Sequence, residues 1–114
     1  MDGAVGEPAA VPLQAATETP WAVAGQQGLV RQVIVPPALA SDRAAYARQV
    51  AMLCEPERTC FLNFYTNSTG APLIAPLPDA IANEATAVFR RSAKQGAERF
   101  RWSCRMKQPD EGCF

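Results

Sequence analysis

Hydrophobic and polar residues alternate strictly between Arg99 and Met106. A period of two is typical of a strand with one buried face and one exposed face. The pattern therefore predicts a strand whose two faces differ sharply. The buried face would carry Phe100, Trp102, Cys104 and Met106, and the exposed face would carry Arg99, Arg101, Ser103 and Arg105.

Two earlier segments also have the pattern of strands. Residues 29–35 are rich in valine and isoleucine, and they end at Pro36-Pro37, which favours the end of a strand. Residues 60–66 alternate in the same way as the arginine-bearing segment. We expect its buried face to carry Cys60, Leu62, Phe64 and Thr66, and its other face to carry Phe61, Asn63 and Tyr65.

Two helices are predicted between these strands. The first begins after Ser41, a good N-cap residue, and runs to about Cys54, before Pro56. The second would begin at Pro78-Asp79 and end at Gly96, a residue suited to a helix C-terminus. Its apolar spacing fits one helix face, formed by Ile81, Ala85, Val88, Phe89 and Ser92.

The order of these elements is strand, helix, strand, helix, strand. We therefore predict a small two-layer α+β domain, with a three- to four-stranded sheet and two helices packed on one face. Cys113-Phe114 is the candidate for the fourth strand. The domain would span residues 27–114, because residues 1–26 are rich in alanine, proline and glycine and have the composition of a flexible tail. Trp21 is the exception in that tail, an aromatic residue suited to docking on the domain.

Four cysteines are available to stabilise a core in which much of the apolar content is alanine. No Cys-x-x-Cys pair and no histidine is present, so the pattern does not indicate a zinc site. We predict the disulfides Cys54–Cys60, joining a helix end to the next strand, and Cys104–Cys113, closing the terminal turn. The alternatives are Cys54–Cys104 with Cys60–Cys113, or free buried thiols in a cytosolic protein.

The segment from Cys60 to Cys104, under half of the chain, resembles a family of small exported bacterial proteins that are functionally uncharacterised. The shared pattern is a cysteine leading an aromatic strand, a proline-rich turn, an alanine-rich helix and a Trp-x-Cys strand. Here those features are Cys60, Leu62, Phe64-Tyr65, Leu77-Pro78, Ala85, Phe89, Gly96 and Trp102-Ser103-Cys104. The chain departs from the pattern at Tyr65, where tryptophan is expected, and in its shortened helix start. The resemblance implies export and a disulfide, and it implies no active site.

Basic residues concentrate in one stretch although the net charge of the chain is zero. Residues 90–107 hold seven arginine or lysine residues and a single acidic residue, Glu98. Such a cluster is suited to binding phosphates or a carboxylate-rich partner, and aromatic residues such as Phe61 would add stacking contacts. The alternative interpretation is a solvated strand face. The candidate binding residues are Tyr65, Arg90, Arg91, Lys94, Arg99, Arg101 and Arg105.

Nothing in the sequence indicates catalysis or a cofactor. The chain contains no histidine, the commonest general base and metal ligand. Asp79 and Glu84 stand five residues apart on the predicted helix and would not share a face. A nucleophilic cysteine would lack a histidine to activate it. We therefore expect a non-enzymatic protein with no cofactor and no metal, and a small enzyme is the least favoured alternative.

Two functional hypotheses follow. The favoured one is an extracytoplasmic module that binds a protein or an envelope component, with an anionic partner as the best match to the basic stretch. The alternative is a cytoplasmic protein that binds nucleic acid or another polyanion. No stretch reaches the length of a membrane span. The even number of cysteines and the resemblance lead us to expect a periplasmic or secreted protein. Met1 is followed by Asp-Gly-Ala, which lacks signal-peptide features, so this expectation presumes a signal peptide that has been removed.

Overall fold

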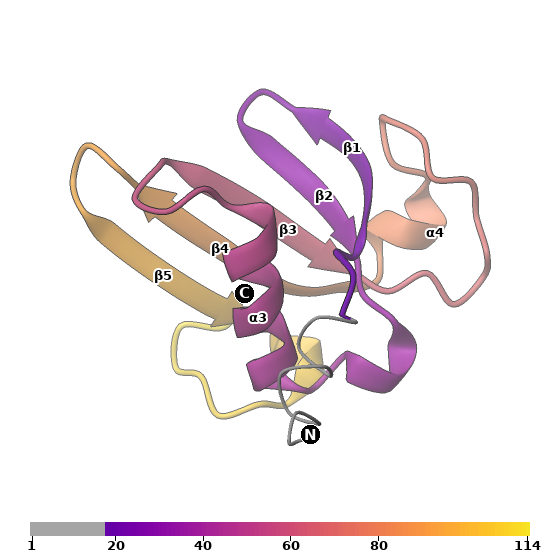
Figure 1. Ribbon diagram of the computed structural model, residues 1–114. Coiled ribbons are helices and arrows are strands. Elements are labelled where there is room, and N and C mark those ends of the chain that lie inside the picture. Colours follow the sequence, from indigo (N-terminus) through magenta and orange to yellow (C-terminus); the bar gives the residue numbers. More distant parts are fainter. Residues whose placement is uncertain (1–17) are drawn as a thin grey trace, which may run out of the picture.

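The computed structural model describes residues 18–114, which form a five-stranded mixed sheet with one helix packed across it (Figure 1). The strands lie across the sheet in sequence order: β1 (Ala22–Gln27), β2 (Val30–Ile34), β3 (Cys60–Tyr65), β4 (Ala85–Ser92) and β5 (Ala97–Trp102). The small α+β domain is confirmed. The sheet has more strands than the sequence predicted, and the order of the elements differs.

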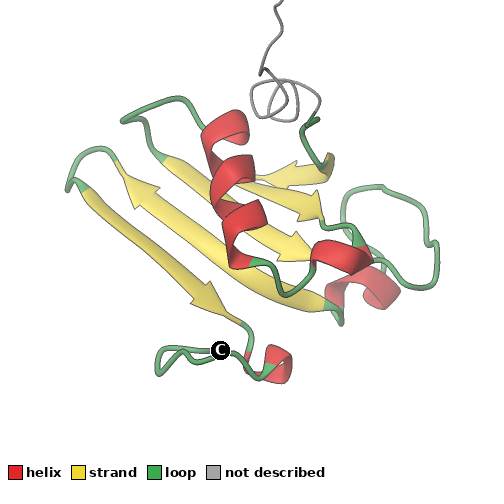
Figure 2. Cartoon of the chain, turned by 60° about the horizontal axis from the view of Figure 1, so that its bottom comes forward, coloured by secondary structure: helices red, strands yellow, loops and turns green. Residues whose placement is uncertain are grey.

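Helix α3 (Arg43–Leu53) connects β2 to β3, and these two strands pair in parallel. The other neighbouring strands pair antiparallel. Figure 2 shows α3 running across one face of the sheet, with β5 at an outer edge. Within residues 18–114 the opposite face carries no long helix, and we call it the open face. The short helices lie beyond the strand ends, and they are η1 (Pro37–Leu39), α4 (Asp79–Ala82) and η2 (Cys104–Met106). On the open face, the loop before α4 lies against β1 through Ala75, and the C-terminal segment lies against Arg99 and Arg101 through Gly112.

Residues 85–92 form strand β4 rather than the second part of a long helix, which corrects the sequence prediction. Only Asp79–Ala82 is helical, as the single turn α4. β4 lies between β3 and β5, and Ala87, Val88 and Phe89 in its middle are all buried. A strand buried on both faces loses the alternation of polar and apolar residues, so its apolar spacing also fits a helix. One long helix, and not two, therefore covers the sheet.

Tyr46 of α3 lies at the centre of the core, with no exposed surface. Its hydroxyl donates to the Ala40 carbonyl at 2.7 Å and lies 2.9 Å from the Thr86 hydroxyl. Because a tyrosine hydroxyl carries one proton, Thr86 is the donor in the second bond. Edge-to-face contacts surround the ring at centroid distances of 4.9 to 5.4 Å, and they come from Trp21, Phe64, Phe100 and Trp102.

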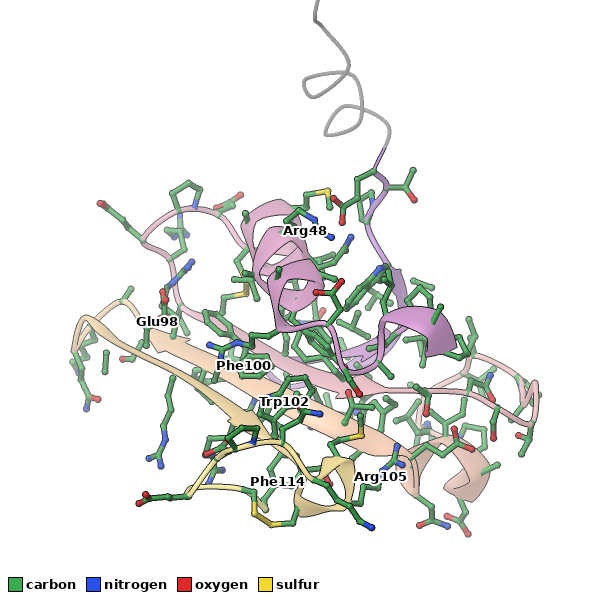
Figure 3. The ribbon with its side chains drawn as sticks, turned by 90° about the horizontal axis from the view of Figure 1, so that it is seen from below. Arg48, Glu98, Phe100, Trp102, Arg105 and Phe114 are labelled. Carbon is green, nitrogen blue, oxygen red and sulfur yellow. A yellow bond between two sulfur atoms is a disulfide. The ribbon has the colours of Figure 1, made fainter. Side chains whose placement is uncertain are left out.

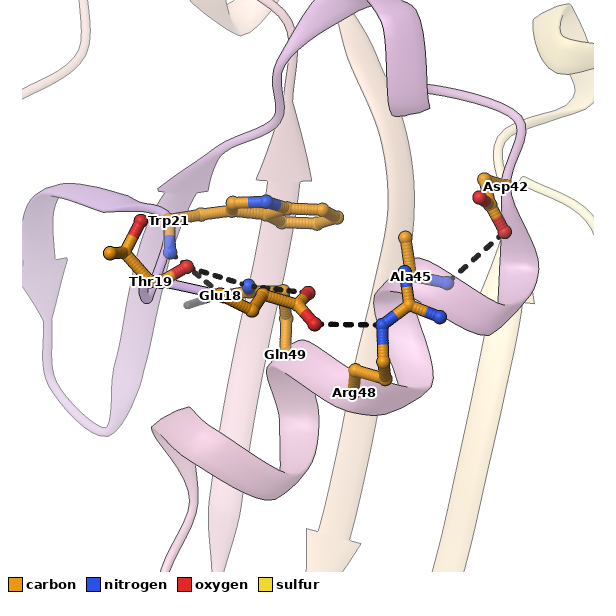
Figure 4. A network of polar contacts seen from close by, with 7 residues as sticks. All are labelled: Glu18, Thr19, Trp21, Asp42, Ala45, Arg48 and Gln49. Carbon is orange, nitrogen blue, oxygen red and sulfur yellow. Dashed lines mark hydrogen bonds and ion pairs between the residues drawn. The ribbon is translucent and has the colours of Figure 1, made fainter. Parts of the chain in front are cut away.

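Residues 18–26 belong to the domain, which corrects the expected tail over residues 1–26. Trp21 is only 8% exposed and packs in the core. The side chain of Gln49 holds this segment, because its Oε1 accepts the Trp21 N–H at 2.7 Å and its Nε2 donates to the Thr19 carbonyl at 2.9 Å (Figure 4). Glu18 pairs with Arg48 at 2.8 Å nearby. The rest of the predicted tail, residues 1–17, lies outside the described residues.

Strand β5 ends at Trp102, before the predicted strand does. Cys104 begins the turn η2 and is exposed, so it does not share the buried face expected for it. The chain then returns to β5, where the Trp102 carbonyl accepts the Phe114 N–H at 3.1 Å. The Asp110 carboxylate accepts the Trp102 N–H at 2.7 Å. The C-terminal segment thus pairs back on β5 as expected, although it forms no strand of its own.

Both predicted disulfides, Cys54–Cys60 and Cys104–Cys113, are present. The first joins the end of α3 to the start of β3, and both of its cysteines are buried. The second ties the C-terminal segment to the turn that follows β5. No cysteine remains free. Each disulfide thus fixes a connection at the end of a sheet strand.

Candidate functional site

The open face carries the two arginines that the alternation of β5 predicted there. Arg99 and Arg101 point away from α3, because the residues that alternate with them pack on the core. Strand pairing sets Arg90 of β4 beside Arg99, and Phe61 of β3 beside Arg90. Tyr65 lies further along β3 on the same side. We call these five residues the basic face.

Arg90 is held by the sheet itself. One guanidinium nitrogen donates to the carbonyls of Leu62 and Phe89, and another donates to Asn63 Oδ1 at 2.8 Å. Its guanidinium also lies 5.5 Å from the centroid of the Phe61 ring. Partial burial lowers the pKa of Arg90 from its ordinary value, and the nearby charge of Arg101 adds to this effect. Arg90 therefore supplies positive charge to the face, with most of its donors already engaged.

Arg99 and Arg101 are the arginines best placed to meet a partner. Neither forms an ion pair with any other residue in the range 18–114. Arg99 is exposed, whereas Arg101 is half-buried, with a guanidinium nitrogen 3.5 Å from the Gly112 carbonyl. The Arg101 guanidinium also lies 5.8 Å from the centroid of the Phe114 ring, which Figure 3 shows on the side of the sheet away from α3.

Asp110 is an acidic residue near this pair of arginines. Its carboxylate accepts the backbone N–H groups of Trp102 and Gly112, and these bonds lower its pKa from the ordinary value, with smaller contributions from Arg99 and Arg101. Asp110 is therefore committed to holding the C-terminal segment. The two arginines keep their ability to bind a carboxylate from outside.

Three of the candidate binding residues lie elsewhere. Arg91 lies on the α3 side of the sheet, because successive strand residues alternate, and it forms an ion pair with Glu98 at 2.9 Å. Lys94 lies in the exposed turn between β4 and β5. Arg105, in η2, donates to the Ala85 carbonyl at 2.6 Å. The structure thus brings together three of the predicted cations with Tyr65, and it separates the other three from them.

A groove of about 330 Å³ opens on the other side of the sheet, between α3 and β5. Its apolar lining comes from Ala47, Val50 and Ala51 of α3 and from Phe89 and Phe100 of the strands. Two of the α3 residues that line the groove, Ala47 and Ala51, are exposed to solvent. The sequence did not indicate this groove, because the expected second helix would have covered this part of the sheet.

Charged residues surround the apolar part of the groove. Arg43 and Arg91 contribute positive charge, and Glu98 is the single acidic residue of the lining. The Arg43 guanidinium stacks on the Phe100 ring, 4.1 Å from its centroid. Figure 3 shows Glu98 and Phe100 on the side of the sheet that carries α3. The groove thus combines apolar contact area with an excess of positive charge.

The remaining polar candidates serve the loop that follows β3. Glu84 accepts hydrogen bonds from the side chains of Thr66 and Ser68, and these bonds lower its pKa from the ordinary value. The Asn67 side chain closes the adjacent turn, by accepting from the Ala71 N–H and donating to the Ala71 carbonyl. Within residues 18–114, no group of His, Cys, Asp or Glu side chains is arranged to hold a metal ion. No helix in the same range is long and apolar enough to cross a membrane.

No family model, curated protein or solved structure matches this chain. The resemblance to small exported bacterial proteins therefore stays a prediction. Functional conclusions rest on the geometry of the basic face and of the groove.

Proposed function

We propose that this chain is a non-enzymatic binding module that recognises an anionic protein or envelope component outside the cytoplasm. The observation that carries the proposal is the pair Arg99 and Arg101, which stand on the sheet face that α3 does not cover and have no ion-pair partners among residues 18–114. A guanidinium presents donors in a planar fork that fits carboxylate and phosphate groups. The module would therefore hold its partner through charge-assisted hydrogen bonds.

The surroundings of the two arginines favour a surface for binding rather than a merely solvated face. Arg90 adds a third positive charge that is fixed in place by Asn63 and two carbonyls. Phe61 and Tyr65 add aromatic surface on the same face. A charge that is already ordered loses little conformational entropy when a partner binds.

The extracytoplasmic location is proposed from the cysteines. All four are paired in disulfides, and disulfides persist mainly in oxidising compartments. A small domain with few large apolar residues also has the most to gain from such cross-links. A thiol titration of the protein isolated from its native host tests this part, because four reactive thiols before reduction would place it in a reducing compartment.

The second candidate is a protein that binds single-stranded nucleic acid. The observation that favours it is the combination of Phe61 and Tyr65 with arginines on one sheet face, since such faces stack bases and contact phosphates. The disulfides weigh against it, because nucleic acid is concentrated in reducing compartments.

Binding of two defined polyanions tests the proposed function. Poly-L-glutamate represents an acidic protein, and an oligothymidylate represents single-stranded nucleic acid. The double variant Arg99→Glu with Arg101→Glu should lose poly-L-glutamate binding. The matched control reverses two charges elsewhere, Arg58→Glu with Lys94→Glu, and should keep it. Added salt should weaken the wild-type interaction because it screens exposed charges.

Equal binding by both double variants would refute the basic face as the site. Tighter binding of the oligothymidylate than of poly-L-glutamate, abolished by the Arg99 and Arg101 reversals, would favour the nucleic-acid function instead. Circular dichroism of both variants checks that any loss of binding reflects charge and not unfolding.

A further inference from the structure

Strand β5 has an edge whose backbone groups are partly unused. Its inner edge pairs with β4, and the residues whose N–H and C=O face the outer edge alternate along the strand. Trp102 faces outward, because it bonds to Asp110 and Phe114 of the C-terminal segment. By the same alternation, Phe100 and Glu98 also face outward, and neither has a backbone partner among residues 18–114.

The C-terminal segment therefore covers only one end of this edge. The covered end is at Trp102, and the disulfide Cys104–Cys113 holds the cover in place. The open end spans the residues before it, up to the turn between β4 and β5. Exposed strand edges of this kind are templates for pairing with another chain.

The side chains that flank the open edge differ on its two sides. On the open face they are Arg99 and Arg101, which belong to the basic face. On the α3 side, the apolar groove begins at Phe100 and reaches α3 at Ala47 and Ala51. A strand added at this edge would lie about 4.8 Å from β5, and its side chains would alternate between these two surroundings.

We propose that the free edge of β5 accepts an extended, acidic segment of the partner as a sixth strand of the sheet. This proposal rests on the proposed function and specifies how the partner binds. Acidic side chains of the segment pair with Arg99 and Arg101, while the alternating aliphatic side chains enter the groove beside Phe100. Main-chain hydrogen bonds to Glu98 and Phe100 supply affinity, and the alternation of acid and aliphatic residues supplies specificity.

Charge selects this occupant over a second copy of the chain. If two β5 edges paired with each other, the arginines of one copy would stand beside those of the other on the open face, next to Arg90. Like charges directly across a strand pair are destabilising. An acidic strand would bring negative charge to the same arginines. The arginines that disfavour pairing between two copies therefore favour pairing with an acidic segment of the partner.

The test uses a synthetic peptide of alternating glutamate and valine. Its control is a peptide of the same charge in which proline replaces each valine, so that it cannot form a strand ladder. The key protein variant is Glu98→Pro, which removes an outward N–H without removing a bond to β4. Its matched control is Glu98→Ala, since both variants lose the ion pair with Arg91 and only the proline variant loses the edge donor.

The Glu98→Pro variant should bind the glutamate–valine peptide about tenfold more weakly than Glu98→Ala, the scale of losing a main-chain hydrogen bond. The proline-containing peptide should bind weakly to the wild type and to both variants. Amide hydrogen exchange of the wild-type protein gives a second measurement, which does not depend on a variant being correctly folded. Saturating peptide should slow exchange at Phe100, which faces outward, and leave Arg101, which faces β4, unchanged.

Equal affinity of the two Glu98 variants, with unchanged exchange at Phe100, would overturn the strand-addition proposal. If the Arg99→Glu and Arg101→Glu double variant still lost peptide binding in that case, the proposed function would stand without strand addition. If that double variant also bound the peptide normally, both the proposed function and the strand-addition proposal would be refuted. Dimerisation through β5 would also overturn the proposal, and it would be seen as a concentration-dependent mass in sedimentation with peptide-free protein.

Discussion

Tyr46 shows how much of the domain can depend on one side chain. Its hydroxyl joins the turn before α3, at Ala40, to the strand β4, at Thr86. Burial raises the pKa of Tyr46 to about 12, although the bond from Thr86 and the charge of Arg105 act in the opposite direction. The folded state therefore favours the neutral hydroxyl. Its stabilising effect is complete below the unfolded pKa of about 10 and is lost as the pH rises toward 12.

Replacing Tyr46 by phenylalanine should lower the free energy of unfolding by about 1–3 kcal/mol, because the buried Thr86 hydroxyl loses its partner. The variant should also lose less stability than the wild type between pH 10 and 12. Urea denaturation at several pH values measures both effects. Tyr65→Phe is the control, since Tyr65 lies on the open face and is only half-buried. An equal cost at the two positions would contradict the central role of Tyr46.

The two faces of β5 predict opposite outcomes for adjacent residues. Trp102 is 4% exposed and packs against Tyr46 and Phe100, so Trp102→Ala should cost about 3–5 kcal/mol. Arg101→Ala should change stability by no more than about 0.5 kcal/mol and should weaken poly-L-glutamate binding. Thermal denaturation of the two variants checks this contrast. A tolerated Trp102→Ala, with an unfolded Arg101→Ala, would show that the faces had been assigned backwards.

Among the elements, strands with one exposed face were predictable and the buried strand β4 was not. Residues 60–65 and 97–102 alternate because one of their faces meets solvent, and alternation identifies such strands in a sequence. β4 has neighbours on both edges and buried residues on both faces, so no alternation remained to distinguish it from a helix. A buried strand is specified by the residues packed around it, and for β4 these include β3, about twenty residues earlier in the chain.

Some features of the candidate site could likewise be predicted from the sequence, and others could not. The positions of Arg99, Arg101 and Tyr65 follow from alternation alone and were predictable. A helix would have placed Arg90 and Arg91 on adjoining faces, whereas a strand sends them to opposite sides of the sheet. The groove and the open edge of β5 depend on how α3 crosses the sheet, and this relation between elements leaves no local signal in the sequence.

The first strand should depend on the few residues that precede it. A chain that lacks residues 1–20 loses Glu18 and Thr19, which accept from the Gln49 side chain. A chain that lacks only residues 1–17 keeps both. Because Gln49 has no exposed surface, we expect the longer truncation to be about 1–3 kcal/mol less stable than the shorter one. Chemical denaturation of the two chains measures the difference, and equal stability would show that residues 18–20 contribute nothing.

At the scale of the whole molecule, the two disulfides act on different parts of the domain. Cys54–Cys60 is part of the core and fixes α3 against β3, whereas Cys104–Cys113 lies at the surface and holds the segment that covers the end of β5. The first therefore bears on global stability. The second bears mainly on the order of the C-terminal residues.

Full reduction should lower the free energy of unfolding by about 2–5 kcal/mol, the range typical of a native disulfide in a small domain. The pair Cys54→Ala with Cys60→Ala should account for most of the loss, and Cys104→Ala with Cys113→Ala for less. Melting curves of the two double variants, compared with the reduced wild type, separate the contributions. Coinciding curves with and without reductant would show that the core is stable without cross-links.

The register shift in β1 between Val23 and Gly25 bears on how concentrated solutions of this protein behave. A sheet that offers a regular edge on both sides can add copies head to tail without closing, which produces fibres. The shift bends β1 and interrupts its row of backbone donors and acceptors, so the β5 edge of one copy finds no regular counterpart in the β1 edge of the next. The chain can therefore keep one edge available for recognition and still resist growing into filaments.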